Sequence, residues 1–176
     1  MKKLSILCIS ITALLLLPAF SLIQEVNSWK IADDYMINFS GRGAQGSFST
    51  LQGSISYDPE NLVGSSIDVH VDVRSIDTGS KGKNKHAKNN SWLDAEQFGK
   101  IRFVSKRFES QGEGMQVIGD LTMHGVTREI TIPYTFSNQT FEGEFTVDRK
   151  DYDIKGPLMG FAVGNEFNIA LKVPVK

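Results

Sequence analysis

A lysine-rich segment is the part of the chain whose residue types most clearly suggest binding chemistry. Lys83, Lys85 and His86 lie within four positions, flanked by Lys81 and Lys88. Cationic side chains of this kind bind phosphate, pyrophosphate or carboxylate groups, and they also bind anionic membrane surfaces. The segment is therefore a candidate site for the polar head group of a ligand or for transient membrane contact. A solvated basic loop is the simpler alternative.

The sequence offers no comparable candidate for catalysis or metal binding. Its three histidines, His70, His86 and His124, do not stand at metal-ligand spacings from one another. The acidic stretch 148–153 is interpreted as a solvated strand end. No nucleophile elbow, phosphate-binding glycine loop or dinucleotide fingerprint occurs. We expect no metal, no cofactor and no enzymatic activity, and an enzyme acting on a lipid or quinone remains a third alternative.

The first residues predict an exported protein. Lys2 and Lys3 precede an almost wholly apolar stretch over residues 4–23, as in a secretory signal peptide. Small residues place the cleavage site between Ser21 and Ser28, and cleavage before Trp29 is favoured, so residues 1–28 would be removed. A retained anchor is the alternative, because the stretch approaches the roughly 20 residues that span a bilayer. The expected location is the periplasm or the outside of the cell.

Cleavage would leave one domain, residues 29–176, without any thiol, because Cys8 is the single cysteine. Such a domain must be held together by its core rather than by disulfides. Without Lys2, Lys3 and Glu25, the 19 basic and 20 acidic residues become 17 and 19, a formal net charge of -2. A chain so close to neutral provides no general attraction for nucleic acid, so no nucleic-acid partner is expected.

Apolar residues recur at every second position through most of this domain. In the segment 67–74 the apolar residues take the odd positions and the polar residues the even ones, and 141–148 and 167–173 behave alike. Because successive strand side chains point to opposite faces, each segment predicts a strand with one wet face. Weaker copies and an opening strand bring the number to eight: 35–40, 51–57, 101–105, 117–123 and 130–136.

Turn residues between these segments predict hairpins and hence an antiparallel barrel or sandwich. A short helix is expected near residues 92–98, with Ser91 as its N-cap and Gly99 at its end. Such a helix could plug one end of a barrel. The predicted fold class is all-β, an eight-stranded antiparallel barrel with one short helix.

The inward positions of these strands form one apolar set. On the pattern alone, a filled core is the simpler interpretation, although an eight-stranded barrel can also hold one small ligand. The set comprises Phe39, Leu51, Ile55, Val69, Val71, Ile101, Phe103, Val117, Leu121, Ile132, Phe145, Phe167 and Ile169.

Several short motifs together resemble one family. They are Trp29-Lys30-Ile31-Ala32, Gly46-Ser47-Phe48, the stretch 73–79, Trp92-Leu93-Asp94-Ala95, Phe103-Val104-Ser105 and the stretch 119–127. In order and spacing they resemble the YceI-like proteins across residues 29–173. The chain departs from that pattern at 40–44, at 83–87 and at Gly99, all in loops near the predicted mouth of the barrel.

The resemblance implies a lipocalin-like barrel whose apolar interior binds a polyisoprenoid, often in the bacterial periplasm. The inward set above then becomes a candidate lipid-binding surface, and Lys83, Lys85 and His86 become candidates for the head group. The expected ligand is an isoprenoid, a quinone or a similar lipid. A ligand-free structural barrel that contacts the envelope or a protein partner is the alternative, since a shared fold does not fix function.

Overall fold

The computed structural model describes residues 28–112, 114–156 and 163–176. The predicted signal peptide therefore lies outside the described residues except for Ser28. The described chain forms one antiparallel sheet in the order β1-β4-β5-β7-β8-β9-β10-β11-β2-β3-β6. The strands are β1 (Ser28–Trp29), β2 (Met36–Gly41), β3 (Ala44–Phe48), β4 (Gln52–Ser56), β5 (Ser66–Asp72), β6 (Ile76–Asp77), β7 (Lys100–Gln111), β8 (Gly114–Met123), β9 (Val126–Ser137), β10 (Thr140–Asp148) and β11 (Glu166–Pro174).

The all-β class is confirmed, and each of the eight predicted strands corresponds to an observed one. The predicted number is wrong, however, because the described residues form eleven strands. The additional strands are β1, β3 and β6, of which β1 and β6 have two residues each. β3 has the sequence Ala-Gln-Gly-Ser-Phe, whose alternation is weak because Ala and Gly occupy two of its three non-polar positions, and it pairs with β2 and β6.

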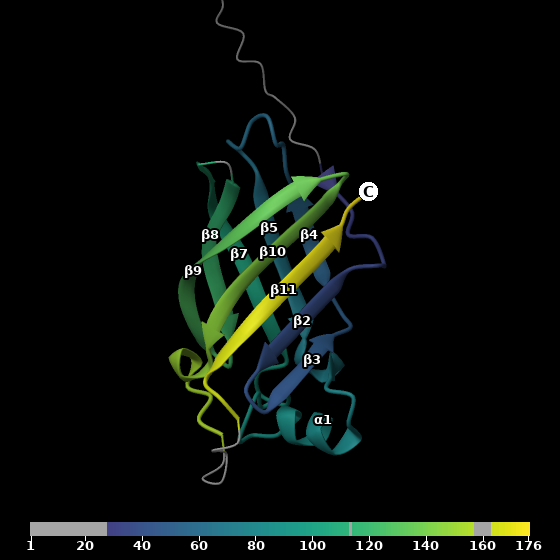
Figure 1. Cartoon of the computed structure of the whole chain (residues 1–176), viewed down its shortest axis with the longest axis vertical. Coiled ribbons are helices and arrows are strands. Elements are labelled where there is room, and N and C mark those ends of the chain that lie inside the picture. Colours follow the sequence, from purple (N-terminus) through teal and green to yellow (C-terminus); the bar gives the residue numbers. More distant parts are fainter. Residues whose placement is uncertain (1–27, 113, 157–162) are drawn as a thin grey trace, which may run out of the picture.

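The sheet curls so that its two ends approach each other, with β9, β10, β11, β2 and β3 in front of β8, β7, β5 and β4 (Figure 1). Two short pairings complete the wall at opposite ends. At one end, Trp29 of β1 pairs with Ile55 of β4, and the Lys30 amide next to it donates to the Lys176 carbonyl at 2.8 Å. At the other end, Phe48 of β3 pairs with Ile76 of β6.

Two hairpins show why the long strands meet in register. His124 and Gly125 join β8 to β9 with φ values of 52° and 77°, and Asn138 and Gln139 join β9 to β10 with 50° and 57°. Positive φ at both central residues is the backbone of a type I′ turn, whose twist matches that of the flanking strands. The hairpins fix the inward and outward parity that the sequence pattern predicts.

The predicted helix at 92–98 is wrong, because turns occupy that stretch and the α-helix α1 spans Lys81–Lys88 instead. Asp94 has a φ of 45°, which interrupts a right-handed helix. In α1, Lys85, His86 and Lys88 lie in the last turn, where positive charge is favourable. Two 3₁₀ turns complete the described structure: η1 (Val73–Ser75) follows β5, and η2 (Arg149–Tyr152) follows β10.

Among the described residues, no helix is both long enough and apolar enough to span a membrane.

Candidate functional site: a cavity inside the barrel

The barrel encloses a cavity of about 420 Å³ with an almost entirely apolar wall. This volume falls within the roughly 300–1,000 Å³ typical of small-molecule sites. All thirteen inward residues predicted from the sequence line the cavity, and they come from β2, β4, β5, β7, β8, β9, β10 and β11, together with the loop that holds Leu51. Strand parity thus places these side chains together, as the alternating pattern predicts.

The burial of these thirteen residues indicates that the interior is hollow rather than filled. Ile55, Val71, Phe103, Val117, Leu121 and Ile132 are buried. The remaining seven, which include Phe39, Phe145 and Phe167, are only half-buried although they line the interior. Inward side chains in a close-packed core would lose this accessible surface. The structure therefore departs from the filled core that the pattern alone favours.

An aromatic cluster fills the end of the barrel opposite α1, which we call the closed end. It consists of Tyr57, Phe108, Tyr134, Phe136 and Phe141, whose ring centroids lie 4.5 to 6.3 Å apart in the contacting pairs. Tyr57 is completely buried, and the Trp29 Nε1 donates to the Tyr57 carbonyl at 2.9 Å. Among the described residues, these packed rings form the end wall of the cavity, to which Tyr134 and Phe141 contribute directly.

Two phenol hydroxyls stand within this cluster. The Tyr134 hydroxyl donates to the Tyr57 hydroxyl at 3.0 Å, and Tyr134 lines the cavity. Burial raises the pKa of Tyr134 far above its ordinary value, and the hydrogen bond to Tyr57 raises it further. Burial also raises the pKa of Tyr57. Both phenols therefore remain neutral, and they place a small polar group at the end of an apolar space.

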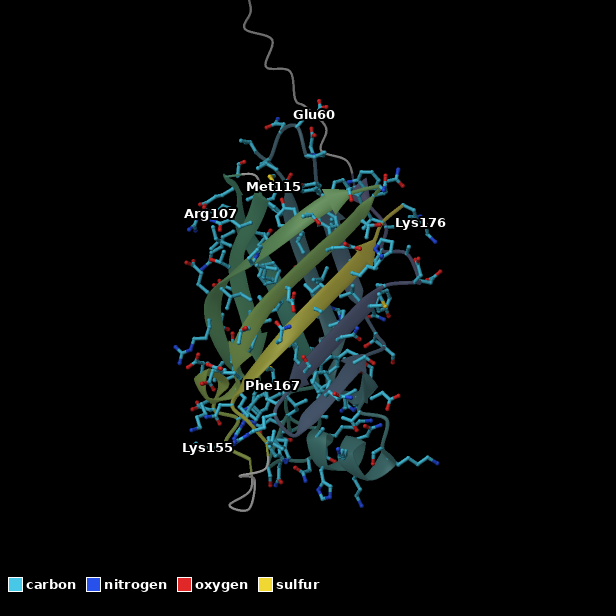
Figure 2. All side chains as sticks on the ribbon, viewed as in Figure 1. Glu60, Arg107, Met115, Lys155, Phe167 and Lys176 are labelled. Atoms are coloured by element: carbon cyan, nitrogen blue, oxygen red, sulfur yellow. The ribbon has the colours of Figure 1, made fainter. Side chains whose placement is uncertain are left out.

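The opposite end, near α1, is the mouth end. Lys83 and His86 of α1 line the cavity there, and both are exposed. Lys85 is also exposed but does not line the cavity, so the three head-group candidates separate into two at the cavity and one outside it. Phe167 and Lys155 lie toward this same end, whereas Glu60 lies at the far end (Figure 2).

Helix α1 is attached mainly through its first turns. The Asn84 side-chain oxygen accepts from the Thr78 amide at 2.8 Å and from the Thr78 hydroxyl at 2.6 Å. The Asn84 side-chain amide donates to Asp77 at 3.1 Å, and this contact lowers the pKa of the Asp77 carboxyl. No residue of α1 is buried. The helix is consequently held to β6 by polar contacts and covers the mouth without belonging to the core.

Arg149 is the functional residue that the sequence reasoning missed. The sequence predicts a solvated strand end at 148–153, but this is wrong for Arg149, which is 8% exposed and lines the cavity. Its Nε donates to the Gly164 carbonyl at 3.0 Å, its Nη1 donates to the Ile154 carbonyl, and its guanidinium carbon lies 5.2 Å from the Trp92 ring centroid. Contacts from three separate segments bury it, so no local sequence signal could identify it.

Other wall residues were also missed, for different reasons. Ile37, Leu171 and Val173 share the inward parity of predicted strands and could have been included from the pattern. Trp92 and Leu93 line the mouth from a turn, and Phe48 lines it from the unpredicted strand β3. The sequence does not assign these three residues to the cavity, because it predicts a helix where Trp92 and Leu93 form a turn and predicts no strand at β3.

The outer face carries ordinary ion pairs. Arg102 and Asp68 are joined by two hydrogen bonds, and the first of these lowers the pKa of the Asp68 carboxyl. Lys106 lies 2.6 Å from Asp120 and 3.1 Å from Glu129. Within the described ranges, no three histidine, cysteine or acidic side chains gather as a metal site would require. The cavity, rather than the outer face, is therefore the candidate functional site of the described structure.

A hollow antiparallel barrel with an apolar interior, closed at one end, defines the lipocalin-like class of ligand-binding barrels. The model of the YceI-like domain matches residues 29–175, and the chain belongs to this family. The chain is 32% identical to a UPF0312 protein of Vibrio vulnificus over 154 residues, covering 73% of this chain and 80% of that protein. It is 28% identical to a UPF0312 protein of Yersinia pestis over 148 residues, covering 70% and 77%.

Solved structures share the fold. Burkholderia cenocepacia BcnA superposes with a TM-score of 0.77 at 22% identity, covering 84% of this chain and 99% of that one. A domain from Saccharophagus degradans, described as polyisoprenoid-binding and implicated in plant cell wall breakdown, gives a TM-score of 0.64 at 16% identity. That match covers 86% of this chain and 98% of the domain. At these identities the similarity establishes the fold.

Proposed function

We propose that this protein is an exported lipid-binding protein that holds a polyisoprenoid, a quinone or a similar long apolar ligand inside its barrel. The observation that carries the proposal is the apolar cavity, with half-buried aromatic side chains on its wall. Membership of the YceI-like family and the likeness to a polyisoprenoid-binding domain support the choice of ligand class. The apolar leader supports export to the periplasm or the cell exterior.

The proposed mechanism is shielding. Each methylene that leaves water for the cavity contributes about 0.8 kcal/mol, so a long chain offsets the cost of association without any strong polar contact. The ligand tail would lie against the inward faces of β10 and β11, pointing to the closed end. Its polar end would remain at the mouth, beside α1. The protein would then carry, buffer or present the lipid in an aqueous compartment.

Two neighbouring positions on β10 provide a matched test. Phe145 lines the cavity, whereas Thr146 is exposed on the outer face of the same strand. We expect protein purified from its own host to release lipid that mass spectrometry can identify. Phe145→Glu should abolish this lipid because it places a charge in the cavity, and Thr146→Glu should retain it.

A native preparation that carries no lipid, and that also fails to bind an added polyprenol or quinone, would refute the proposal. Equal lipid loading in Phe145→Glu and Thr146→Glu would move the binding site away from the cavity. The lipid-free outcome, by contrast, would favour the structural-barrel alternative.

A further inference from the structure

Arg149 is a buried cation at the mouth end of the cavity. It begins η2 directly after β10, and its aromatic neighbour Trp92 comes from the turn that follows α1. Two of its nitrogens donate to the carbonyls of Ile154 and Gly164. No hydrogen bond of its Nη2 is found among the described residues, where no fully buried side-chain nitrogen lacks a partner, so this nitrogen keeps some accessible surface. The guanidinium is thus held in place with donor capacity left over, and the residue contributes to the cavity wall.

No carboxylate in the described chain forms an ion pair with Arg149. The nearest in sequence, Asp148, accepts from the Lys150 amide at 2.8 Å and caps η2. Residues 157–162 read Pro-Leu-Met-Gly-Phe-Ala and contain no acid. Guanidinium remains charged in proteins, and burying a charge without an opposite charge is costly. Two carbonyls and a ring offset part of this cost, and an anion would offset the rest.

The other charged residues that line the cavity also place positive charge at the mouth end and negative charge away from it. Lys83 and His86 line the mouth from α1, and neither makes an ion pair within the described ranges. Glu142 is the acidic residue of the wall, and it pairs with Lys172 at 2.9 Å near the start of β10. That position lies toward the closed end, next to Phe141. Positive charge is therefore concentrated where the ligand's polar end would lie.

We infer that Arg149, together with Lys83 and His86, forms a site for an anionic head group, a phosphate ester or a carboxylate, on a lipid whose chain occupies the cavity. This inference rests on the proposed function and specifies its ligand. Guanidinium is suited to the task because its planar donors match the oxygens of phosphate and carboxylate. The apolar chain supplies affinity, and the three cations select the head group.

The test compares two ligands that differ only at the head. The full chain is expressed, stripped of lipid and titrated with a polyprenyl phosphate and with the polyprenol of the same length. Trp92 fluorescence serves as one readout because its ring contacts Arg149, and calorimetry serves as a second. We expect the phosphate to bind at least tenfold more tightly than the alcohol. Arg149→Gln should bring this ratio close to one, because it should weaken binding of the phosphate far more than binding of the alcohol.

Lys85→Gln is the matched control, since Lys85 is a cation of α1 outside the cavity wall, and its ratio should match that of the wild type. If Arg149→Gln fails to fold, the double variant Lys83→Gln, His86→Gln changes only exposed residues and should lower the ratio at least threefold. An unchanged ratio in the double variant would overturn the three-cation site.

The remaining outcomes distinguish a failure of the head-group site from a failure of the proposed lipid-binding function. Equal binding of phosphate and alcohol by the wild type would overturn the head-group site while keeping the lipid-binding function. Equal losses for both ligands in Arg149→Gln would make Arg149 purely structural and would also overturn it. Binding of inorganic phosphate as tightly as the phosphate ester would assign the site to a free anion instead. Failure to bind either lipid would overturn the proposed function and the inference together.

Discussion

The closed end and the mouth end belong to one sheet, yet they are packed in different ways. At the closed end, aromatic side chains from β7, β9 and β10 interlock with Tyr57, which follows β4 and has no exposed surface. At the mouth, Phe39, Phe145 and Phe167 keep accessible surface, and α1 contributes no buried residue. Close packing is therefore concentrated at the closed end, whereas the wall at the mouth end keeps surface that a ligand could cover.

The largest expected effect is a contrast in stability between the two ends. Tyr57→Ala should lower the free energy of unfolding by about 3 to 5 kcal/mol, as is typical for a buried aromatic residue. Phe167→Ala should cost clearly less, because Phe167 already borders empty space, and it should weaken lipid binding instead. Urea denaturation and lipid titration of both variants test this. Equal destabilisation would contradict the division between the ends.

High pH should destabilise the fold through its buried phenols, two of which lie at the closed end and one, Tyr152, in η2. Burial raises the pKa of Tyr57 and Tyr134, and it raises that of Tyr152 to about 12. Because the folded pKa values exceed the unfolded value of about 10, these groups stabilise the protein fully below pH 10. Above pH 10, each can remove up to about 1.4 kcal/mol per pH unit. Thermal denaturation between pH 9 and 11.5 should show a steep fall.

This effect can be separated from the general loss of charge on lysines. Tyr35 is the fourth tyrosine and lies outside the aromatic cluster, with its hydroxyl donating to the Ser49 carbonyl. Tyr134→Phe should make the alkaline fall shallower, and Tyr35→Phe should leave its slope unchanged. Identical slopes in the two variants would show that the buried phenols do not control alkaline stability.

The phenol pair should also give a strong coupling energy. Tyr134→Phe leaves the buried Tyr57 hydroxyl without its partner and should cost about 1 to 3 kcal/mol. The double variant Tyr57→Phe, Tyr134→Phe removes both polar groups, so its cost should be smaller than the sum of the single costs. A double-mutant cycle from urea denaturation measures this. Simple additivity would indicate that the two hydroxyls do not stabilise each other.

The smallest expected effect lies in α1. A Cβ at Gly82 would have only the Ser80 side chain near it, at 4.0 Å. Gly82→Ala should therefore stabilise the helix by about 0.5 to 1 kcal/mol, or roughly two- to fivefold in hydrogen-exchange protection of its amides. The global midpoint in urea should not change, because α1 does not belong to the core. A matching rise in global stability would place α1 in the cooperative unit.

How far the sequence predicts this structure depends on the kind of signal. Alternation in 67–74, 141–148 and 167–173 predicts strands and also their inward faces, because parity alone decides which side chains meet. β3 and the position of α1 were not predictable in this way, since their conformations depend on tertiary contacts at Asp77, Thr78 and β2. Arg149 lies among charged neighbours, and only the folded chain brings Trp92 and two carbonyls around it.

The alternating pattern alone does not predict the hollow interior, which only the family resemblance implies. The same inward residues could fill a barrel or line a cavity, because the pattern fixes direction but not the distance between facing walls. That distance follows from the curl of the sheet and from the short pairings of β1 with β4 and of β3 with β6. These pairings involve two-residue strands, which leave no periodic signal.

The order in which the barrel assembles is constrained at the closed end, by a seam where the first described residues meet both β4 and β11. Residues 28–32 join β4 to the end of β11, so the two extremes of the described chain must meet before the wall is complete. Contacts between such distant segments form slowly. A chain that has not yet brought these segments together cannot form this seam. If the cavity holds a lipid as proposed, the lipid would enter only after the barrel is complete.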